Sequence, residues 1–276
     1  MNTRSIALEI INDVLNNGAY SNLSLNQKIK ENNLNEKDIA LLTEIVYGTI
    51  KNIMLLDYYL EPYLKIKKPE PWFQNLLRMS VYQLKFLDKV PNYAIVNEAV
   101  NIAKKKSKAK LDKMVNAILR NIIRNGFRSL DEIKDEKMRL SIETSYPMWI
   151  IDLWERQFGF DITKKICFAN METPLNTARV NINDEGATEL FQKYEKGLLS
   201  KNAIIVSSSI VKLKEYKEGL ISPQDEASMY AVEVLNPKSG DIILDMCAAP
   251  GGKSLYMASL MENIGEIHAV DLYEHK

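Results

Sequence analysis

Cysteine and histidine are both scarce in this chain of 276 residues. Its two cysteines are Cys167 and Cys247, and its two histidines are His268 and His275. Two isolated thiols cannot build a disulfide framework, and with so few histidines they cannot complete a Cys/His zinc site. The composition therefore excludes a disulfide-stapled secreted scaffold and predicts that the protein binds no metal.

The chain also lacks an excess of charge of either sign and any long apolar run. Lys and Arg number 36, as do Asp and Glu, so the net charge of zero identifies no partner. The N-terminal segment MNTRSIALEI is amphipathic from its start and contains no signal-peptide core. No window approaches the roughly 18 apolar residues that span a bilayer. We therefore expect a cytoplasmic protein with no membrane partner.

The residues that are present have an ordinary globular composition. With 46% hydrophobic and 26% charged residues, the chain can build cores, which excludes disorder. Over residues 1–128, apolar side chains recur at helical spacing, as Ile6, Ile10 and Val14 do. Helix starts and ends are signalled by Asn17-Gly18, Asn35, Pro71, Pro91 and Asn125-Gly126. We predict an all-α bundle over residues 1–128.

The character of the sequence changes after this bundle. Residues 129–145 are polar and charged, which predicts a connector. Tyr146-Pro147 then introduces an amphipathic helix whose apolar stripe includes Trp149 and Trp154, so we expect both indoles in a core. Beyond it come two strand-like runs, at residues 178–182 and 203–206. A helical pattern at residues 185–194 separates them. This alternation predicts a small α+β domain over residues 146–220.

The last segment, residues 221–276, has the pattern of an α/β domain. In chain order come a helix at 226–235, a strand at 242–246, a Gly-rich loop at 247–252, a helix from Lys253 and a strand at 267–271. This order is typical of the opening of a Rossmann-like fold. Because the chain ends five residues later, we expect only the N-terminal part of that domain. The predicted fold is multidomain: an all-α bundle, a small α+β middle domain and the start of a Rossmann-like α/β domain.

The Gly-rich turn predicts a ligand site. Pro250-Gly251-Gly252 lets a ligand approach the backbone closely, and the helix that follows offers free N–H groups to an anion. Asp271 ends the second strand, where a carboxylate can accept from ribose hydroxyls. A phosphate-binding P-loop would need glycine at position 247, which is Cys247, and a Gly-x-Gly-x-x-Gly fingerprint is absent. S-adenosylmethionine is the remaining nucleotide ligand.

The residues of this turn also carry a family resemblance. Asp245–Lys253, DMCAAPGGK, resembles the cofactor motif of the RNA cytosine-C5 methyltransferases, and Ser222–Ser228, SPQDEAS, is similar to the segment that precedes it there. Segments of the bundle resemble a NusB-like domain, namely residues 20–22, 44–49, 97–100 and 116–120. Residues 146–181 resemble the family's small middle domain. The resemblance covers nearly the whole chain and indicates the RsmB family of bacterial 16S ribosomal RNA methyltransferases, with a NusB-like N-terminal domain.

The resemblance implies a cofactor, a site and a mechanism. The cofactor is S-adenosyl-L-methionine, and the residues expected to bind it are Cys247, Ala248, Ala249, Pro250, Gly251, Gly252, Lys253 and Asp271. In this family a cysteine thiolate adds to cytosine C6 and so makes C5 nucleophilic. We expect neither Cys167 in a middle-domain helix nor Cys247 in the cofactor turn to be that nucleophile. The catalytic cysteines are expected beyond the end of this chain, which alone should transfer no methyl group and bind the cofactor weakly.

Positive charge is concentrated near the end of the bundle. Residues 101–128 carry nine Lys and Arg against Asp112 alone, a net charge of +8, so the rest of the chain sums to −8. A charge run is often only a solvated helix face, but counterion release on phosphate binding accounts better for this segregation. The expected RNA-binding residues are Lys104, Lys105, Lys106, Lys108, Lys110, Lys113, Arg120 and Arg124. We expect 16S ribosomal RNA as the partner.

Two other functions remain open from the sequence. A non-catalytic, NusB-like RNA-binding protein would account for the bundle and its basic cluster, but it leaves residues 245–253 and Asp271 without a purpose. A methyltransferase acting on transfer RNA would use the same cofactor motif.

Overall fold

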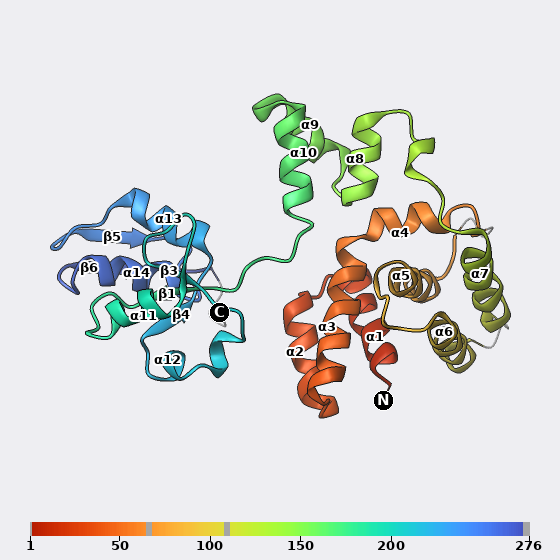
Figure 1. The fold of residues 1–276 in the computed structure, drawn as a ribbon, viewed down its shortest axis with the longest axis horizontal. Helices are drawn as coiled ribbons and strands as arrows, with labels where there is room; N and C mark the ends of the chain where they lie inside the picture. The colour runs from red at the N-terminus through yellow and green to blue at the C-terminus, as the bar shows by residue number, and fades with distance from the viewer. Residues whose placement is uncertain (1, 65–67, 108–110, 273–276) are drawn as a thin grey trace. The chain divides into compact units, whose positions relative to one another are not determined.

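The computed structural model describes residues 2–64, 68–107 and 111–272. It divides into two compact units, Met1–Glu172 and Thr173–Lys276 (Figure 1). The first unit is helical and the second contains both sheets, so the predicted succession of an all-α bundle, a small α+β part and the start of an α/β part is confirmed.

The first unit is built from helices joined by short connections. Their bounds are α1 Thr3–Asn17, α2 Ser21–Asn32, α3 Glu36–Lys51, α4 Ile53–Leu60, α5 Pro71–Phe86, α6 Asn92–Lys106, α7 Leu111–Asn125, the 3₁₀ turn η1 Leu130–Glu132, α8 Glu136–Thr144, α9 Met148–Phe158 and α10 Phe160–Ala169. One apolar core runs through α1 to α7 and includes the fully buried Ile6, Leu42 and Leu76. Their regular spacing along each helix is what the sequence showed as amphipathic stripes.

Local sequence determines where these helices begin and end. The Asn35 side chain accepts a hydrogen bond from the N–H of Asp38 and so caps α3, as predicted. Pro71 is the first residue of α5, where its missing N–H costs nothing. Gly18 follows α1 with a φ of 72°, which explains why glycine stands there.

Helices α3 and α5 approach each other closely at Gly48. A Cβ placed on Gly48 would lie 1.9 Å from the ring of Tyr82. The Tyr82 hydroxyl donates a hydrogen bond to Glu44, one turn earlier on α3. Burial, and then this bond, raise the pKa of Tyr82. The absence of a side chain at Gly48 therefore creates the space that the Tyr82 ring occupies.

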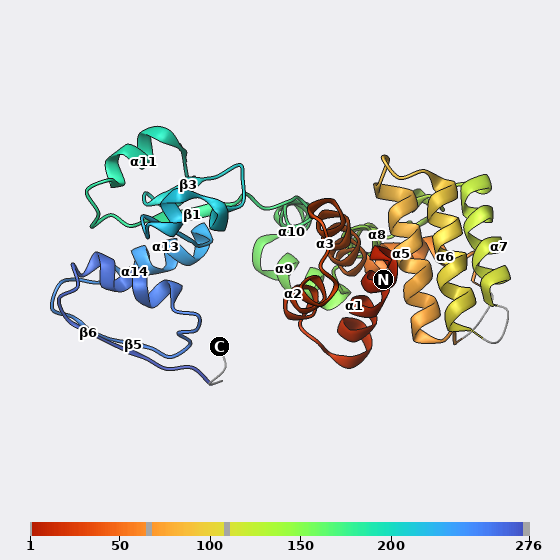
Figure 2. The same ribbon diagram turned by 90° about the horizontal axis from the view of Figure 1, so that it is seen from below.

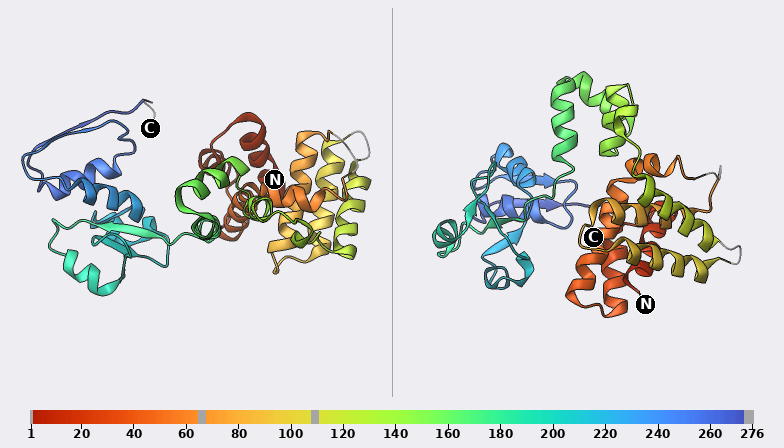
Figure 3. Two further views of the ribbon diagram at one scale, coloured as in Figure 1. Left: turned by 90° about the horizontal axis from the view of Figure 1, so that it is seen from above. Right: turned by 45° about the vertical axis from the view of Figure 1, so that its right-hand side comes forward.

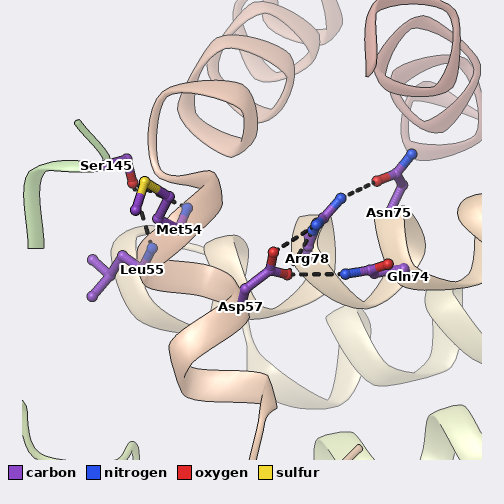
Figure 4. Close-up of polar contacts among 7 residues, drawn as sticks. All are labelled: Met54, Leu55, Asp57, Gln74, Asn75, Arg78 and Ser145. Atoms are coloured by element: carbon purple, nitrogen blue, oxygen red, sulfur yellow. Dashed lines mark hydrogen bonds and ion pairs between the residues drawn. The ribbon is translucent and has the colours of Figure 1, made fainter. Parts of the chain in front are cut away.

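Polar contacts join α4 to its neighbours (Figure 4). Arg78 on α5 donates two hydrogen bonds to the carboxylate of Asp57 on α4, from Nε at 2.7 Å and from Nη2 at 2.6 Å. At the other end of α4, the Ser145 hydroxyl, which follows α8, accepts from the N–H groups of Met54 and Leu55 at 3.2 and 3.4 Å. First-turn N–H groups have no partner within a helix, so Ser145 satisfies two of them and fixes α8 to the bundle.

Helices α8, α9 and α10 form a small second core (green in Figure 3). Cys167 is fully buried there with Leu140 and Ile151, and burial raises the pKa of its thiol. This agrees with a structural role for Cys167. Trp154 packs against this core, but Trp149 is 66% exposed, so the prediction of a core position is wrong for Trp149. The stripe on α9 is wider than the surface its neighbours cover.

The length and hydropathy of the helices bear on membrane insertion. Within the described residues, no single helix is long and apolar enough to cross a membrane. The pair α3 and α4, which is bent by 77°, has the necessary length and composition when the two are taken together.

The second unit contains a four-stranded antiparallel sheet and a two-stranded parallel one. The first has the order β2-β3-β1-β4, with β1 Thr177–Val180, β2 Glu195–Lys196, β3 Ala203–Ile205 and β4 Ile221–Pro223. Its remaining elements are α11 Ala187–Lys193, η2 Ile210–Lys212 and α12 Lys214–Lys217. The second sheet pairs β5 Ile242–Asp245 with β6 Glu266–Ala269 in parallel, and α14 Gly252–Leu260 connects them. Helix α13 Glu226–Leu235 comes between the two sheets in the chain.

A buried carboxylate joins α13 to the first sheet. Glu226 is 8% exposed and accepts hydrogen bonds from the N–H groups of Leu198, Leu199 and Ser200, at 3.2, 2.7 and 3.1 Å. Burial alone would raise the pKa of Glu226, but these three bonds outweigh it and hold the pKa below its ordinary value. Gly197 leaves room for the carboxylate, since a Cβ there would lie 2.5 Å from Glu226 Oε2.

Candidate functional site

The predicted cofactor turn lies between the end of β5 and the start of α14 (Figure 1). Because β5 and β6 are parallel and in register from Ile242 to Asp245, their carboxyl ends meet at one edge. Asp245 ends β5, and Asp271 lies two residues after β6 ends at Ala269. The second strand thus ends two residues earlier than predicted, but both carboxylates still lie at the carboxyl ends of the strands, where α/β sheets bind ligands.

Asp245 orders the loop from its own strand. Its Oδ1 accepts a hydrogen bond from the N–H of Cys247 at 3.2 Å, and its Oδ2 accepts one from the Ser254 hydroxyl at 2.7 Å. One carboxylate therefore holds both the beginning of the loop and the first turn of α14.

Asp271 holds the middle of the same loop. Its Oδ2 accepts a hydrogen bond from the N–H of Ala249 at 3.0 Å. Next to it, the N–H of Ala248 donates to the carbonyl of Val270 at 3.0 Å. Two residues of the loop are thus fixed against the segment that follows β6, which brings Asp271 together with the turn.

The glycines of the turn leave its backbone accessible. Gly251 has a φ of 99°, in the left-handed region, and a Cβ built on it would meet no atom within 4 Å. Gly252 begins α14, whose first-turn N–H groups have no acceptor within the helix. The open space at Gly251, which directly precedes the N-terminus of α14, fits the carboxylate of an amino acid, and the Asp271 carboxylate at Ala249 fits a ribose. The residues present are compatible with S-adenosylmethionine.

One of the predicted cofactor residues, Lys253, lines a different surface from Asp271. Lys253 lines a hollow of about 310 Å³ between α13, β5 and α14, with Asp245 and Met246 among its neighbours. Asp271 is not part of that lining. Cys247 is exposed on the loop. The structure therefore brings Ala248 and Ala249 together with the segment that carries Asp271, whereas Lys253 lines a hollow to which Asp271 does not contribute.

Further side chains, which the sequence did not identify as part of the site, support the turn. Gln224 lies against Gly252, with 3.8 Å between its side-chain carbonyl carbon and a Cβ built on that glycine. Arg179, which is 5% exposed, donates from Nε to Gln224 Oε1 at 2.8 Å and lies 5.0 Å over the ring of Tyr256 on α14. Burial lowers the pKa of Arg179. Gln224 belongs to segment 222–228, whose family resemblance was the signal that could have identified it.

Tyr256 continues this support. It is fully buried, accepts from Asn202 Nδ2 at 2.7 Å and donates to Glu233 Oε1 at 2.6 Å. Burial, and then the bond to Glu233, raise the pKa of Tyr256 to about 12. The hydroxyl of Tyr256 is therefore protonated at neutral pH and fixes α14 against the loop that carries Asn202.

The predicted RNA-binding residues lie on the hairpin of α6 and α7 (Figure 2). Lys104, Lys105 and Lys106 form the last turn of α6 and are exposed. Lys113, Arg120 and Arg124 are exposed on α7 at intervals of seven and four residues, which places them on one face. Lys108 and Lys110 lie outside the described residues. The remaining six form the hairpin cluster, Lys104–Lys106 with Lys113, Arg120 and Arg124.

Arg128 does not belong to this cluster, although it contributed to the charge of +8. Its guanidinium lies 4.5 Å over the ring of Tyr58 and forms ion pairs with Glu61 at 2.6 Å and Glu132 at 2.8 Å. The charge of Arg128 is therefore paired with carboxylates of the protein itself.

Comparison with known proteins finds similar sequences for both ends of the chain. Residues 1–124 match the family model described as the NusB family, and residues 232–276 match that of the 16S rRNA methyltransferase RsmB/F. The two matches lie at opposite ends of the chain, the first in the helical unit and the second in the unit that contains the sheets. The probable ribosomal RNA small subunit methyltransferase B of Bacillus subtilis (strain 168) is 42% identical over 99% of this chain and 63% of its own length. Its namesake from Synechocystis is 29% identical over 98% of this chain and 64% of its own length.

A solved structure shares the fold. The crystal structure of PH0851 superposes on 100% of this chain and 65% of its own, with a TM-score of 0.72 and 22% sequence identity. The chain spans slightly less than two thirds of the length of the two RsmB relatives. Within the described residues, no group of three or more His, Cys, Asp or Glu side chains is arranged to hold a metal ion.

Proposed function

We propose that this chain forms the RNA-binding and cofactor-binding front part of an S-adenosylmethionine-dependent enzyme that methylates cytosine C5 in 16S ribosomal RNA. One observation carries the proposal: the loop of the RsmB/F-matching segment is held between Asp245 and Asp271 with its glycines accessible. The names of the relatives support ribosomal RNA of the small subunit as the substrate. Such an enzyme acts in the cytoplasm, where that RNA is made.

The proposal gives the residues around the turn distinct tasks. When bound, S-adenosylmethionine supplies an electrophilic methyl group. Asp271 would accept from the ribose hydroxyls, and the first-turn N–H groups of α14, at Gly252 and Lys253, would hold the amino-acid carboxylate. Cys247, Ala248, Ala249, Pro250 and Gly251 would form the wall of the pocket. Asp245 keeps that wall in place through Cys247 and Ser254.

The nucleophile is assigned to neither cysteine of this chain. Addition of a thiolate to cytosine C6 makes C5 nucleophilic and requires a sulfur that reaches the base. Cys167 is fully buried in a separate core, and the pKa of its thiol is raised, so it is unsuited to this task. Cys247 lies on the loop assigned to the cofactor. We therefore propose that the full-length protein supplies the thiolate from another segment.

The test compares this chain with the full-length protein. Tritiated methyl transfer from S-adenosylmethionine is measured on 16S ribosomal RNA transcripts and on transfer RNA. We expect the full-length protein to label C5 of a cytosine in 16S RNA only, and this chain to label neither RNA. Labelling of transfer RNA alone would favour the alternative substrate, and turnover by this chain would contradict the assignment of the nucleophile.

A second measurement addresses the non-catalytic alternative. Isothermal titration of this chain with S-adenosylmethionine should show binding, weaker than that of the full-length protein. Absence of cofactor binding by the full-length protein, together with retained RNA affinity, would instead identify a NusB-like RNA-binding protein.

A further inference from the structure

A groove at one end of the α6–α7 hairpin has an aromatic wall and two guanidinium groups. It has a volume of about 430 Å³ and is lined by Asn92, Tyr93, Val96, Arg120, Ile123 and Arg124. Tyr93 lies in the first turn of α6, while the two arginines lie in the second half of α7. Since the two helices run side by side in opposite directions (Figure 2), the start of one meets the end of the other.

Tyr93 is among the most exposed aromatic side chains of the described residues. Its side chain is 72% exposed, and Ile123 beside it is 41% exposed, while Val96 below them is buried at 3%. Tyr93 therefore contributes little to the core of the bundle. An exposed aromatic ring with an apolar floor provides a surface on which another ring can stack.

The side chains of the two arginines are held in place by neighbouring asparagines. Arg120 donates from Nε to Asn116 Oδ1 at 2.9 Å, and Arg124 donates from Nη2 to Asn121. Within the described residues, neither guanidinium is paired with a carboxylate, and the six residues that line the groove include no acid. A guanidinium has five N–H donors, so each retains donors for a ligand. The asparagines reduce the entropy that these side chains would lose on binding.

We propose that this groove binds an unstacked nucleotide of single-stranded RNA, with its base on Tyr93 and its phosphates at Arg120 and Arg124. Aromatic rings beside cations are how proteins hold single strands, because every base has a face that can stack and every phosphate carries charge. Lys104–Lys106 of the hairpin cluster lie at the end of α6, and the groove lies at the beginning of the same helix. Together they would form one RNA-binding surface along the hairpin. The inference deepens the proposed RNA-binding function and rests on it.

The test measures binding of the full chain to two fluorescent probes, a 12-nucleotide oligocytidylate with a central 2-aminopurine and an RNA duplex of the same length. Loss of one stacked base costs about tenfold in affinity, so Tyr93→Ala should weaken binding to the single strand about tenfold. Binding to the duplex, whose bases are not free to stack on the protein, should not change. Tyr93→Phe should restore the affinity and the quenching of 2-aminopurine. Tyr216→Ala, which removes an exposed tyrosine of the second unit, is the matched control.

The arginines give an independent readout. Binding of the single strand is measured at several salt concentrations, and the logarithm of the affinity is plotted against the logarithm of the salt concentration. Replacing both arginines by glutamine should reduce the magnitude of this slope by about 1.4, because each phosphate that is no longer neutralised reduces it by about 0.7. Unchanged single-strand affinity in Tyr93→Ala, or an equal loss on the duplex, would overturn the groove. If Lys104–Lys106→Glu still weakens binding in that case, the RNA interface stands without the groove. If no variant weakens binding, the RNA-binding function itself fails.

Discussion

The carboxylate of Asp271 accepts a hydrogen bond from the N–H of Ala249 at 3.0 Å, across 22 residues of sequence. The contact joins the carboxylate assigned to the ribose to the loop assigned to the rest of the cofactor. Shape of the loop and recognition of the ligand therefore depend on the same side chain.

Asp271→Asn should weaken binding of S-adenosylmethionine about tenfold or more, because a charge-assisted hydrogen bond contributes about 1.5 to 3 kcal/mol. The amide keeps the size of the carboxylate, so the thermal stability of the chain should change little. Isothermal titration gives the affinity, and Glu262→Gln, at an exposed residue just after α14, is the control. Equal affinities of Asp271→Asn and the wild-type chain would remove Asp271 from the site.

Reversal of charge at Lys104, Lys105 and Lys106 should weaken RNA binding and flatten its dependence on salt. When three phosphates are no longer neutralised, the slope for a single strand falls by about 2. The same change at three exposed lysines of the second unit, Lys196, Lys201 and Lys217, is the matched control. Anisotropy titrations between low and moderate salt measure both slopes, and an unchanged slope would exclude the lysines from the interface.

Glu226→Gln should destabilise the second unit by about 2 to 3 kcal/mol at pH 7, because three N–H groups lose a charged acceptor. The folded-state pKa of Glu226 lies below its unfolded value. Its contribution is therefore complete above the ordinary glutamate pKa of about 4.3 and is lost as the pH falls through the folded value. Urea unfolding at pH 7 and at a pH below the folded-state pKa of Glu226 should show that the stabilities of the two proteins converge in acid. A constant difference would contradict this assignment.

Gly48→Ala should destabilise the bundle by about 1 to 3 kcal/mol, the range for overpacked cores, since the new methyl group overlaps the Tyr82 ring. Gly18→Ala, which introduces strain at a positive φ but no clash, separates backbone strain from overlap. Thermal unfolding measures both, and the double variant Gly48→Ala with Tyr82→Leu should recover part of the loss. Full stability of Gly48→Ala would show that α3 and α5 can separate freely.

Features set by neighbouring residues were predictable from the sequence. The cap at Asn35, the helix start at Pro71 and the stop at Gly18 depend only on a few adjacent residues. The accessible turn at Gly251 was predictable for the same reason, because glycine at a strand–helix junction has few other uses.

Features that depend on distant residues were not predictable. The stripe of α9 indicates which face is apolar but not how much of it a neighbour covers, and Trp149 is consequently exposed. Strand β2 has two residues and no periodicity. Arg179 and Glu226 have partners 45 and 26 to 28 residues away, so their roles follow only from the fold. The assignment of individual residues to cofactor and RNA stays a prediction.

The contrast between the two cysteines has a practical consequence. Cys167 is enclosed in the core of α8, α9 and α10, while Cys247 is exposed on the turn between β5 and α14. A maleimide dye added to the folded protein at neutral pH would therefore label Cys247 first, and no cysteine would have to be introduced. Protection of that thiol by added ligand would report occupancy of the turn, and appearance of the second reactive thiol would report the opening of the helical core.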